Sequence, residues 1–380
     1  MPQQIQRVLP AKGAKIALGM SGGVDSSVAA HLLLEQGYQV TGVFLECWRA
    51  PGCRSEEDRK DALKVALSLG IPFQVLDFKQ RYKDSVVEYF FEEYKAGRTP
   101  NPDVLCNKEI KFGLFYDWAM ENNFEYVATG HYAEVVQFEG KLQLAIPKDA
   151  HKDQTYFLYL LQQEQLAHVY FPLGNLLKTE VRAIAEEKQL HVAKKKDSVG
   201  ICFIGDINVH EFLKERLGEN PGEVVDTKGR VIGNHTGLWF YTIGQRHGFE
   251  INKRTLIEQS DGSIVEKENI PPFYVIKKLP ETNQLMVGFG ANTYFTQFEI
   301  TEPYGIYPAT DFTQLQLQVR IRHTGKLLSS VAHAAGNGSL SIHLVEPTQG
   351  IAEGQSAVFY SEEQGRLICH GGGVITNPTR

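Results

Sequence analysis

The sequence lacks any long run of apolar residues. No uninterrupted apolar stretch among its 380 residues is long enough to span a bilayer. Residues 1–6 have neither the apolar core of a secretory signal nor the Arg- and Ser-rich character of a transit peptide. These absences argue against a membrane or exported protein, and they predict a cytoplasmic one.

Cysteine is also scarce. The five cysteines are Cys47, Cys53, Cys106, Cys202 and Cys369. An odd number in a long chain fits a reducing compartment better than a disulfide scaffold. No two of them are spaced as Cys-x-x-Cys, so the spacing does not predict a structural zinc site. For Cys47, Cys53 and Cys369 we expect ordinary buried thiols.

The chain has no excess of positive charge. It contains 39 Lys and Arg residues against 45 Asp and Glu residues, which gives a formal net charge of −6. This balance excludes a surface that is basic all over, but it allows a local basic groove for a nucleic acid. A hydrophobic fraction of 42% is typical of a globular protein, and the length predicts two or three domains.

The chain contains no Walker A motif, and its glycine-rich segment is not the dinucleotide fingerprint Gly-x-Gly-x-x-Gly. Residues 19–27 read instead Gly-Met-Ser-Gly-Gly-Val-Asp-Ser-Ser. They follow a short apolar run at 15–18, which predicts a buried strand, and precede residues 28–34, whose spacing is helical. We therefore expect a strand, a loop and a helix in this order.

The composition of residues 19–27 predicts a polyphosphate site. Gly22 and Gly23 let the backbone approach a ligand closely. Ser26 and Ser27 place hydroxyl and N–H groups at a helix N-terminus, which attracts phosphate. Asp25 would repel a bare phosphate, so its presence predicts a divalent cation between the two. The alternative is a Gly-rich turn that only joins a strand to a helix.

Strands and helices alternate through the first half of the chain. We predict strands at 39–45, 71–76 and 126–130, and helices at 56–69, 80–96 and 108–122. Such alternation is typical of an α/β fold with a parallel sheet and helices on both faces. Ligands bind at the carboxyl ends of such strands, where residues 19–27, Leu45 and Gly130 would lie.

After about residue 205 the pattern changes. One helix at 208–217 precedes Gly-rich turns and short strands at 222–225, 237–240 and 241–244, and residues 250–271 read as a loop. Short strands at 273–276, 315–321 and 356–360 predict a small β-barrel. The domains we expect are 1–205, with the parallel sheet, 206–272, small and mixed α/β, and 273–380, the barrel.

Two cysteines lie in unusual surroundings. Cys106 follows a loop with two prolines and precedes Lys108 and Lys111, while Cys202 follows the triple-lysine run 194–196. Neighbouring cations and a helix N-terminus favour a thiolate. From these residues alone, a reactive thiol and an inert buried thiol remain equal alternatives at both positions.

Several motifs in a fixed order resemble the tRNA-uridine 2-sulfurtransferases (tRNA 2-thiouridylases), members of the PP-loop ATP pyrophosphatase superfamily. The motifs are Ser-Gly-Gly-Val-Asp-Ser, Asn-Pro-Asp-x-x-Cys-Asn, Thr-Gly-His-Tyr-Ala, Lys-Asp-Gln-Thr-Tyr-Phe-Leu and Gly-Ile-Cys-Phe-Ile-Gly. The similarity continues through residues 241–248 and 354–360, and so covers essentially the whole chain.

The resemblance implies an ATP-dependent enzyme that thiolates C2 of the wobble uridine of tRNA. ATP adenylates the C2 oxygen, and sulfur carried as a persulfide then displaces AMP. By position, Cys202 matches the persulfide cysteine and Cys106 its partner nucleophile. Either the terminal persulfide sulfur attacks directly, or Cys106 releases hydrosulfide and closes a Cys106–Cys202 disulfide; both routes stay open.

The resemblance also assigns binding residues. Leu45 replaces the methionine often found beside adenine, and Asp103 would hold the uracil or shuttle a proton, with a plain helix N-cap as its alternative. The implied ATP contacts, with magnesium near Asp25, are Gly19, Met20, Ser21, Gly22, Gly23, Val24, Asp25, Ser26, Leu45 and Gly130. The implied contacts to the target base are Asn101, Pro102 and Asp103, and those to the rest of the tRNA are His131, Lys152, Asp153, Gln154, Arg320, Ile321 and Gln355.

The implied partners are tRNAs for Lys, Glu and Gln and a persulfide carrier protein or cysteine desulfurase. An alternative is another PP-loop adenylating ligase, similar to the amidotransferase-like synthetases, which would need no cysteine pair. A second alternative is an RNA-binding module without catalysis, which would predict a disabled loop, whereas Ser21, Asp25 and Ser26 are intact. The sequence leaves open the sulfur donor, the oligomeric state and an iron–sulfur cluster on Cys106 and Cys202.

Overall fold

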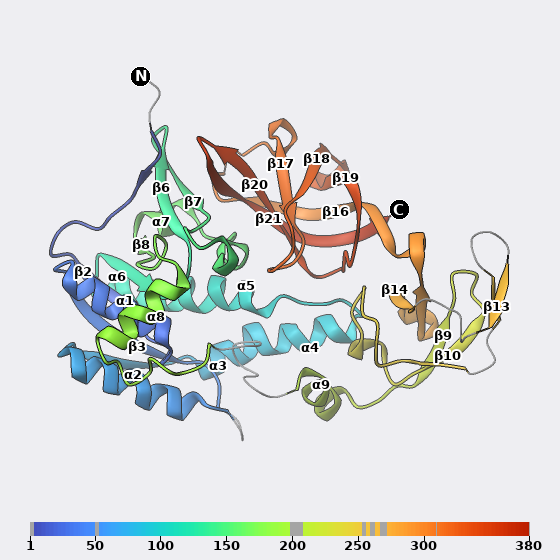
Figure 1. Cartoon of the computed structure of the whole chain (residues 1–380), viewed down its shortest axis with the longest axis horizontal. Helices are drawn as coiled ribbons and strands as arrows, with labels where there is room; N and C mark the ends of the chain where they lie inside the picture. Colours follow the sequence, from blue (N-terminus) through green and yellow to red (C-terminus); the bar gives the residue numbers. More distant parts are fainter. Residues whose placement is uncertain are drawn as a thin grey trace.

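The computed structural model describes residues 4–49, 53–197, 208–252, 256–258, 263–266, 272–308 and 310–379. Cys202 lies outside these ranges. The described residues form a parallel sheet with its helices, a five-stranded sheet and a β-barrel (Figure 1). We call them the parallel-sheet module, the central sheet and the barrel.

The parallel-sheet module confirms the α/β fold predicted from the alternation of strands and helices. Its strand order is β4-β3-β2-β5-β8, and every pairing is parallel. The strands are β2 (Lys15–Gly19), β3 (Gln39–Glu46), β4 (Phe73–Asp77), β5 (Tyr126–Thr129) and β8 (Val169–Tyr170).

Helices cover both faces of this sheet. Ile16 and Leu18 belong to one buried cluster, while Ala17, which lies between them on β2, belongs to the cluster on the opposite face. The first face carries α1 (Val24–Glu35), α2 (Ser55–Leu69) and α8 (Lys178–Glu187); the second carries the continuous segment of α5 (Pro102–Cys106), η2 (Asn107–Leu114) and α6 (Phe115–Glu121).

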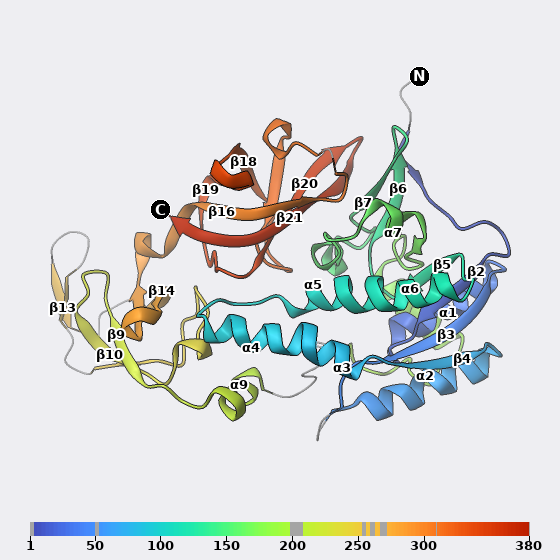
Figure 2. The ribbon, with the colours of Figure 1, turned by 180° about the vertical axis from the view of Figure 1, so that it is seen from behind.

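A long helical arm extends from the parallel-sheet module to the central sheet (Figures 1 and 2). It consists of α3 (Lys79–Tyr82), η1 (Lys83–Val87) and α4 (Glu88–Lys95). The ring of Phe91 lies 5.0 Å from that of Phe212 on α9 (Val209–Leu217). The arm therefore packs against α9 through aromatic side chains.

The central sheet extends beyond residue 272, where we expected a domain to end. The parallel pairing of β15 with β9 places Leu285 opposite Val224, and both side chains are fully buried in one core. This shared core explains why the sheet continues to Gly288. In spatial order its strands are β11 (Glu250–Ile251), β10 (Val231–His235), β9 (Gly222–Val225), β15 (Gln284–Gly288) and β14 (Tyr274–Leu279).

Three local predictions in this part were wrong. Residues 241–244, where we expected a strand, form no strand and end in a turn, because Gly244 has a φ of +88°, which breaks an extended chain. Residues 238–240 form a 3₁₀ turn (η5, Leu238–Phe240) instead of a strand, because Leu238 and Tyr241 both reach the core at a spacing of three residues. The stretch 250–271, which we read as a loop, contains β11 and a hairpin of β12 (Leu256–Glu258) and β13 (Ile264–Glu266).

The last part of the chain forms the closed barrel that the short strands predicted. Its order is β21-β16-β19-β18-β17-β20, and β20 pairs with β21 to close it. The strands are β16 (Tyr294–Gly305), β17 (Leu317–Arg320), β18 (Leu328–Ala334), β19 (Leu340–Gln349), β20 (Ser356–Glu363) and β21 (Arg366–Thr379).

The barrel is joined to the parallel-sheet module by a hairpin that we did not predict. β6 (Glu134–Phe138) and β7 (Lys141–Ala145) extend the barrel sheet where Ala145 pairs with Ile368 of β21, and β1 (Gln6–Arg7) pairs with β6. Tyr360 and Cys369 of the barrel share a buried cluster with Phe115 of α6. No helix in the described ranges is long and apolar enough to cross a membrane.

Candidate active site

Residues 19–27 form a tight loop between β2 and α1, which we call the 19–27 loop. Ser26 Oγ accepts a hydrogen bond from the backbone N–H of Ser21 at 3.1 Å, and Ser27 Oγ donates to the Gly23 carbonyl at 2.7 Å. Gly23 is the N-cap of α1 and supplies no side-chain cap. The first turn of α1 therefore presents N–H groups that a phosphate can accept from.

Close backbone packing holds this loop from two sides. A β-carbon on Gly22, whose φ is +73°, would lie 2.1 Å from the Asp58 carbonyl oxygen on α2. A β-carbon on Gly130, directly after β5, would lie 2.8 Å from the Ser26 nitrogen. Glycine is therefore required at both positions, and the structure places Gly130 beside the loop, as expected.

Lys195 fixes the loop from a third side. Its Nζ donates to the Gly22 carbonyl at 2.9 Å and to carboxylate oxygens of Asp58 and Asp61 at 2.7 Å each. Burial disfavours the charged amine, but the hydrogen bonds with Asp58 and Asp61 outweigh this and raise the pKa of Lys195. Lys195 belongs to the triple-lysine run 194–196 that precedes Cys202 in the sequence. In the structure it supports the 19–27 loop.

Asp25 lies in a polar cluster at the start of α1. Lys178 Nζ contacts the two Asp25 carboxylate oxygens at 2.7 and 2.8 Å, and the Tyr132 hydroxyl donates to Asp25 Oδ1 at 3.0 Å. Burial and the Asp25 carboxylate together raise the pKa of Tyr132, so it is a neutral donor. Asp25 is therefore a hydrogen-bonded carboxylate on the loop itself.

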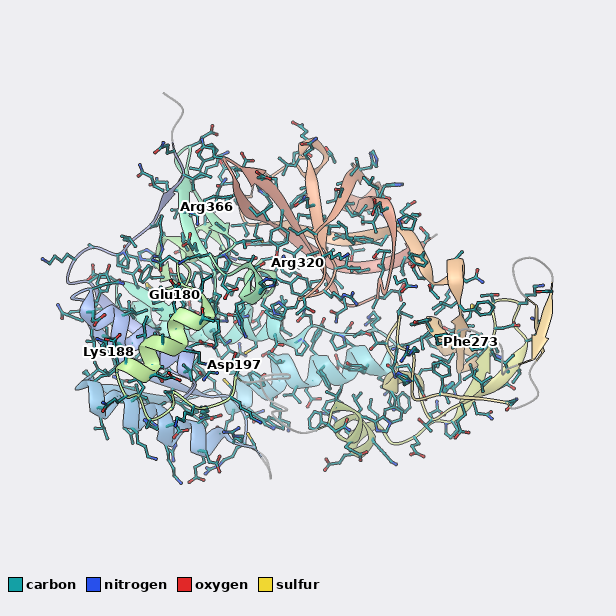
Figure 3. The ribbon with its side chains drawn as sticks, in the orientation of Figure 1. Glu180, Lys188, Asp197, Phe273, Arg320 and Arg366 are labelled. Atoms are coloured by element: carbon teal, nitrogen blue, oxygen red, sulfur yellow. The ribbon has the colours of Figure 1, made fainter. Side chains whose placement is uncertain are left out.

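A second carboxylate, Asp197, extends this cluster. Its oxygens accept from Lys178 and from Lys152, each at 2.9 Å, and it also pairs with Arg182. Burial opposes ionisation, but the bonds from Lys152 and Lys178 dominate and hold the pKa of Asp197 well below its ordinary value. Figure 3 shows Asp197 just beyond α8, beside the module that carries the loop. Lys152, which we expected to contact tRNA, is thus linked to the loop through Asp197.

Leu45, which we expect beside adenine, lies near the end of β3. The Met20 nitrogen donates to the Val43 carbonyl at 2.8 Å, and the Met20 side chain is buried. Leu45 is half-buried and lies one residue before the end of β3. Gly19 pairs with Val43 and with Thr129, so Leu45, the loop and Gly130 share the carboxyl edge of the sheet, as predicted.

The Asn-Pro-Asp segment enters α5 at the junction with the barrel. Pro102 is the first residue of α5, and Asn101 is its N-cap. The side chain of Asn101 makes no capping hydrogen bond to the helix. Asp103 lies in the first turn, so it is not the N-cap that we weighed as its alternative role. The side chain of Asn101 instead bonds with Tyr156, which also donates to the Ser356 carbonyl of the barrel at 2.9 Å.

Cys106 is the last residue of α5 and is buried, with 2% of its surface exposed. It packs with Val86, Phe90 and Ile110. The neighbouring Lys108 pairs with Glu109 at 3.0 Å. Because Cys202 lies outside the described residues, the meeting of the two thiols stays a prediction.

Asp153 and Arg320 form a buried ion pair between the parallel-sheet module and the barrel. Figure 3 labels Arg320 on the barrel. Asp153 Oδ1 also accepts from Thr155 N at 2.9 Å and Thr155 Oγ1 at 2.7 Å. The Arg320 guanidinium lies 5.2 Å from the Tyr360 ring centroid, and Ile321 beside it is 4% exposed. These residues hold the two parts together, and their contact with RNA stays a prediction.

The other expected RNA contacts are also engaged within the protein. Gln154 Oε1 accepts from the Tyr132 nitrogen at 2.9 Å, and Gln355 Nε2 donates to the loop before α5. His131 Nδ1 lies 2.7 Å from Thr129 Oγ1, and its Nε2 lies 3.5 Å from Lys111. Burial and Lys111 lower the pKa of His131 well below its ordinary value, so the ring is neutral.

Four site residues were missed in the sequence: Tyr132, Lys178, Arg182 and Asp197. Lys178 and Asp25 are 153 positions apart, and neither has a local pattern that would pair them. Only the fold brings α8 to the start of α1. Tyr132 could have been predicted from the sequence, because it directly follows Gly130 and His131, which we expected at the site.

Comparison with known proteins identifies the family of the chain. Over 374 residues the chain is 41% identical to the tRNA-specific 2-thiouridylase MnmA of Staphylococcus aureus (strain bovine RF122 / ET3-1), which covers 96% of this chain and 95% of that protein. The enzyme of the same name from Staphylococcus epidermidis (strain ATCC 12228 / FDA PCI 1200) matches equally. The chain belongs to the tRNA-specific 2-thiouridylase family. This confirms the resemblance read from its motifs.

Three family models match consecutive parts of the chain. They are described as a tRNA methyl transferase HUP domain at residues 14–206, a tRNA methyl transferase PRC-barrel domain at 210–289 and an aminomethyltransferase beta-barrel domain at 296–375. Among solved structures, the U34-tRNA thiolase NcsA of Methanococcus maripaludis is 21% identical with a TM-score of 0.35, over 51% of this chain and 62% of that one.

Proposed function

We propose that the protein transfers sulfur to C2 of the wobble uridine of tRNA, in an ATP-dependent reaction. The observation that carries this proposal is the intact 19–27 loop, packed closely against Asp58 of α2 and against Gly130, in a chain that matches 2-thiouridylases over 96% of its length. An adenylating ligase with an amine nucleophile is the less favoured alternative, because its relatives would not be expected to share the barrel and the cysteines.

The geometry of the loop fits a magnesium nucleotide. The uncapped first turn of α1 and the hydroxyl of Ser21 offer donors for phosphate oxygens. The carboxylate of Asp25 is a hard oxygen ligand suited to Mg²⁺, which would supply charge neutralisation of the triphosphate. Leu45 and Gly130 at the carboxyl edge of the sheet would border the adenine.

The first step we propose is adenylation of the uridine. The C2 oxygen forms a bond with the α-phosphorus of ATP, and the bond between that phosphorus and the β-phosphate oxygen breaks, which releases pyrophosphate. The oxygen then leaves readily as part of AMP, whereas an unactivated carbonyl oxygen is a poor leaving group. Asn101 and Asp103, at the start of α5, are the residues we assign to the uracil edge.

The second step we propose is sulfur transfer between Cys202, Cys106 and the activated C2. In both open routes the terminal persulfide sulfur of Cys202 ends on C2, AMP departs, and Cys106 takes the remaining Cys202 sulfur in a disulfide. A thiol reductant then restores the two cysteines. Because Cys106 is 2% exposed, either route requires its cover of Val86 and Phe90 to open, and the π-helical turn η2 that follows it is a suitable place for the change.

The partners we propose are a tRNA with an unmodified wobble uridine and a protein that delivers persulfide sulfur, both in the cytosol. Lys152, 41% exposed, suits a phosphate contact, and the tRNA anticodon loop offers the unpaired uridine. The uridine must turn out of its stack to reach α5.

The test is a thiolation assay with the full-length chain, ATP, magnesium, a persulfide donor and unmodified tRNA, read by nucleoside mass spectrometry. We expect 2-thiouridine from the native protein and from Cys53→Ser, whose half-buried thiol lies near Trp48. We expect none from Cys202→Ser or Cys106→Ser, with ATP binding retained. Absence of 2-thiouridine from the native protein with every sulfur donor would refute the proposal.

A further inference from the structure

The 19–27 loop contains no lysine or arginine, unlike a Walker A loop, whose own lysine binds phosphate. A triphosphate brings several negative charges to this loop, beside the carboxylate of Asp25. Among the residues that the structure describes, the lysines in hydrogen-bond contact with the loop come from much later in the chain. They are Lys178, at the first position of α8, and Lys195.

These two lysines are held in different ways. Lys195 bonds to the backbone of Gly22 and to Asp58 and Asp61 of α2, so all three of its N–H donors serve the framework of the loop. Lys178 instead contacts both oxygens of Asp25, the carboxylate on the loop itself, and one oxygen of Asp197. Lys178 therefore occupies the carboxylate that a divalent cation at this loop would need.

We propose that Lys178 is a phosphate-positioning residue that Asp25 holds in place until a nucleotide arrives. When Asp25 turns to a divalent cation, Lys178 loses two of its three acceptors and donates instead to a phosphate oxygen at the N-terminus of α1. The inference rests on the proposed binding of a magnesium nucleotide, and it adds the residue that replaces the missing loop lysine.

Asp197 keeps Lys178 near the loop throughout this exchange. It is fixed by Lys152 and Arg182, and Arg182 is itself fixed by bonds to the carbonyl oxygens of Ala193 at 2.8 Å and Lys195 at 2.6 Å. Lys178 is 13% exposed, so it cannot swing freely into solvent. Once Asp25 has turned away, the Lys178 ammonium is held on one side by Asp197 and can donate on the other side to a phosphate oxygen.

A purely structural role for the Lys178–Asp25 pair predicts different behaviour. If the pair only stabilised the fold, removing Lys178 would weaken cation and nucleotide binding together, because Asp25 would lose its orientation. If Lys178 competes with the cation and then binds phosphate, removing it has opposite effects on the two affinities. This difference in sign is the basis of the test.

The experiment measures binding to the full-length protein without tRNA. Mn²⁺ alone is followed by electron paramagnetic resonance, and magnesium ATP by calorimetry. For Lys178→Gln we expect Mn²⁺ to bind about two- to fivefold more tightly, and magnesium ATP about 10- to 100-fold more weakly. Lys178→Arg should retain ATP affinity within about fivefold. The matched control is Lys188→Gln, at the other end of α8, whose amine pairs with Glu35 at 3.1 Å.

Amine-reactive labelling of the native protein provides a second measurement that needs no variant. Labelling of Lys178 should rise when Mg²⁺ alone is added and fall again with magnesium ATP, as read by peptide mass spectrometry. Unchanged ATP affinity in Lys178→Gln, or a parallel loss of both affinities, would overturn the inference while leaving ATP binding in place. Failure of the native protein to bind ATP would instead overturn the proposed function, and the inference with it.

Discussion

The side-chain amide of Gln355 lies 3.0 Å from the carbonyl oxygen of Pro100. The same nitrogen donates to the Thr99 carbonyl at 3.0 Å, and the Thr99 nitrogen donates to the Glu353 carbonyl at 2.8 Å. The barrel therefore holds the loop that leads into Asn101 and α5. Through these bonds a residue of the barrel can influence the residues that we assign to the target base.

Gln355→Glu tests this relationship, since the new carboxylate has nearly the same shape but cannot donate to the two carbonyl oxygens. We expect kcat for thiolation to fall about tenfold, because the loss of two hydrogen bonds misplaces the segment of Asn101. KM for tRNA should change less than threefold. Gln74→Glu, on the exposed edge strand β4, introduces the same charge far from this loop and should leave both constants unchanged. A rise in KM with unchanged kcat would show that Gln355 contacts tRNA directly.

Gly130→Ala should strongly weaken nucleotide binding without unfolding the protein. The new β-carbon would meet the Ser26 nitrogen at 2.8 Å and the Asp25 carbonyl carbon at 3.1 Å, and these backbone atoms at the start of α1 cannot give way cheaply. We expect the affinity for magnesium ATP to fall at least about 30-fold, measured by calorimetry. Gly336→Ala, where a β-carbon meets nothing within 4 Å, is the control. Native affinity in Gly130→Ala would show that the loop tolerates this displacement.

Local patterns predicted the features that depend on neighbouring residues. The short apolar run at 15–18, the serines and the helical spacing after Val28 were enough to place the 19–27 loop between β2 and α1. The alternation of strands and helices likewise predicted the parallel sheet, because each βαβ unit is encoded within about 30 residues.

The remaining features depend on residues far apart in the sequence. Lys178 reaches Asp25 only because α8 packs on the same face of the sheet as α1, and β15 joins β9 only after the chain has passed through a hairpin. The hairpin of β6 and β7 gave no sign that it would extend the barrel at Ile368. Such pairings are decided by tertiary packing, which single-sequence periodicity does not contain.

Arg320→Met should destabilise the junction between the barrel and the parallel-sheet module. The Asp153 carboxylate, which is 2% exposed, would then lack its cation. We expect this to lower the free energy of unfolding by about 3–5 kcal/mol. We expect the apparent midpoint of thermal unfolding to fall, and the double variant Asp153→Asn with Arg320→Met to recover most of the loss. Arg322→Met, an exposed neighbour, is the control. A drop in tRNA affinity with unchanged stability would contradict a structural role for the pair.

Lys278 is a buried cation whose ammonium has no hydrogen-bond partner among the residues that the structure describes. It lies on β14 where this strand meets the end of the helical arm, since its Cδ is 3.9 Å from the position of a β-carbon on Gly97. Burial lowers the pKa of Lys278 to about 7, although the Glu353 carboxylate acts in the opposite direction. The ordinary pKa of a lysine is about 10.5.

Between pH 10.5 and about 7 the unfolded chain therefore holds a proton at Lys278 that the folded chain does not. Folding stability falls as the pH is lowered through this window, and below about pH 7 this residue causes no further change. Lys278→Met removes the free-energy cost of burying this amine. We therefore expect the free energy of unfolding to rise by on the order of a few kcal/mol at pH 7, and by much less at pH 10. Urea unfolding at both pH values, followed by tryptophan fluorescence, measures this. Lys277→Met, the exposed neighbour on the same strand, should show neither the gain nor its pH dependence. Equal stability of Lys278→Met and the native protein at pH 7 would mean that the buried amine is compensated by a group not yet identified.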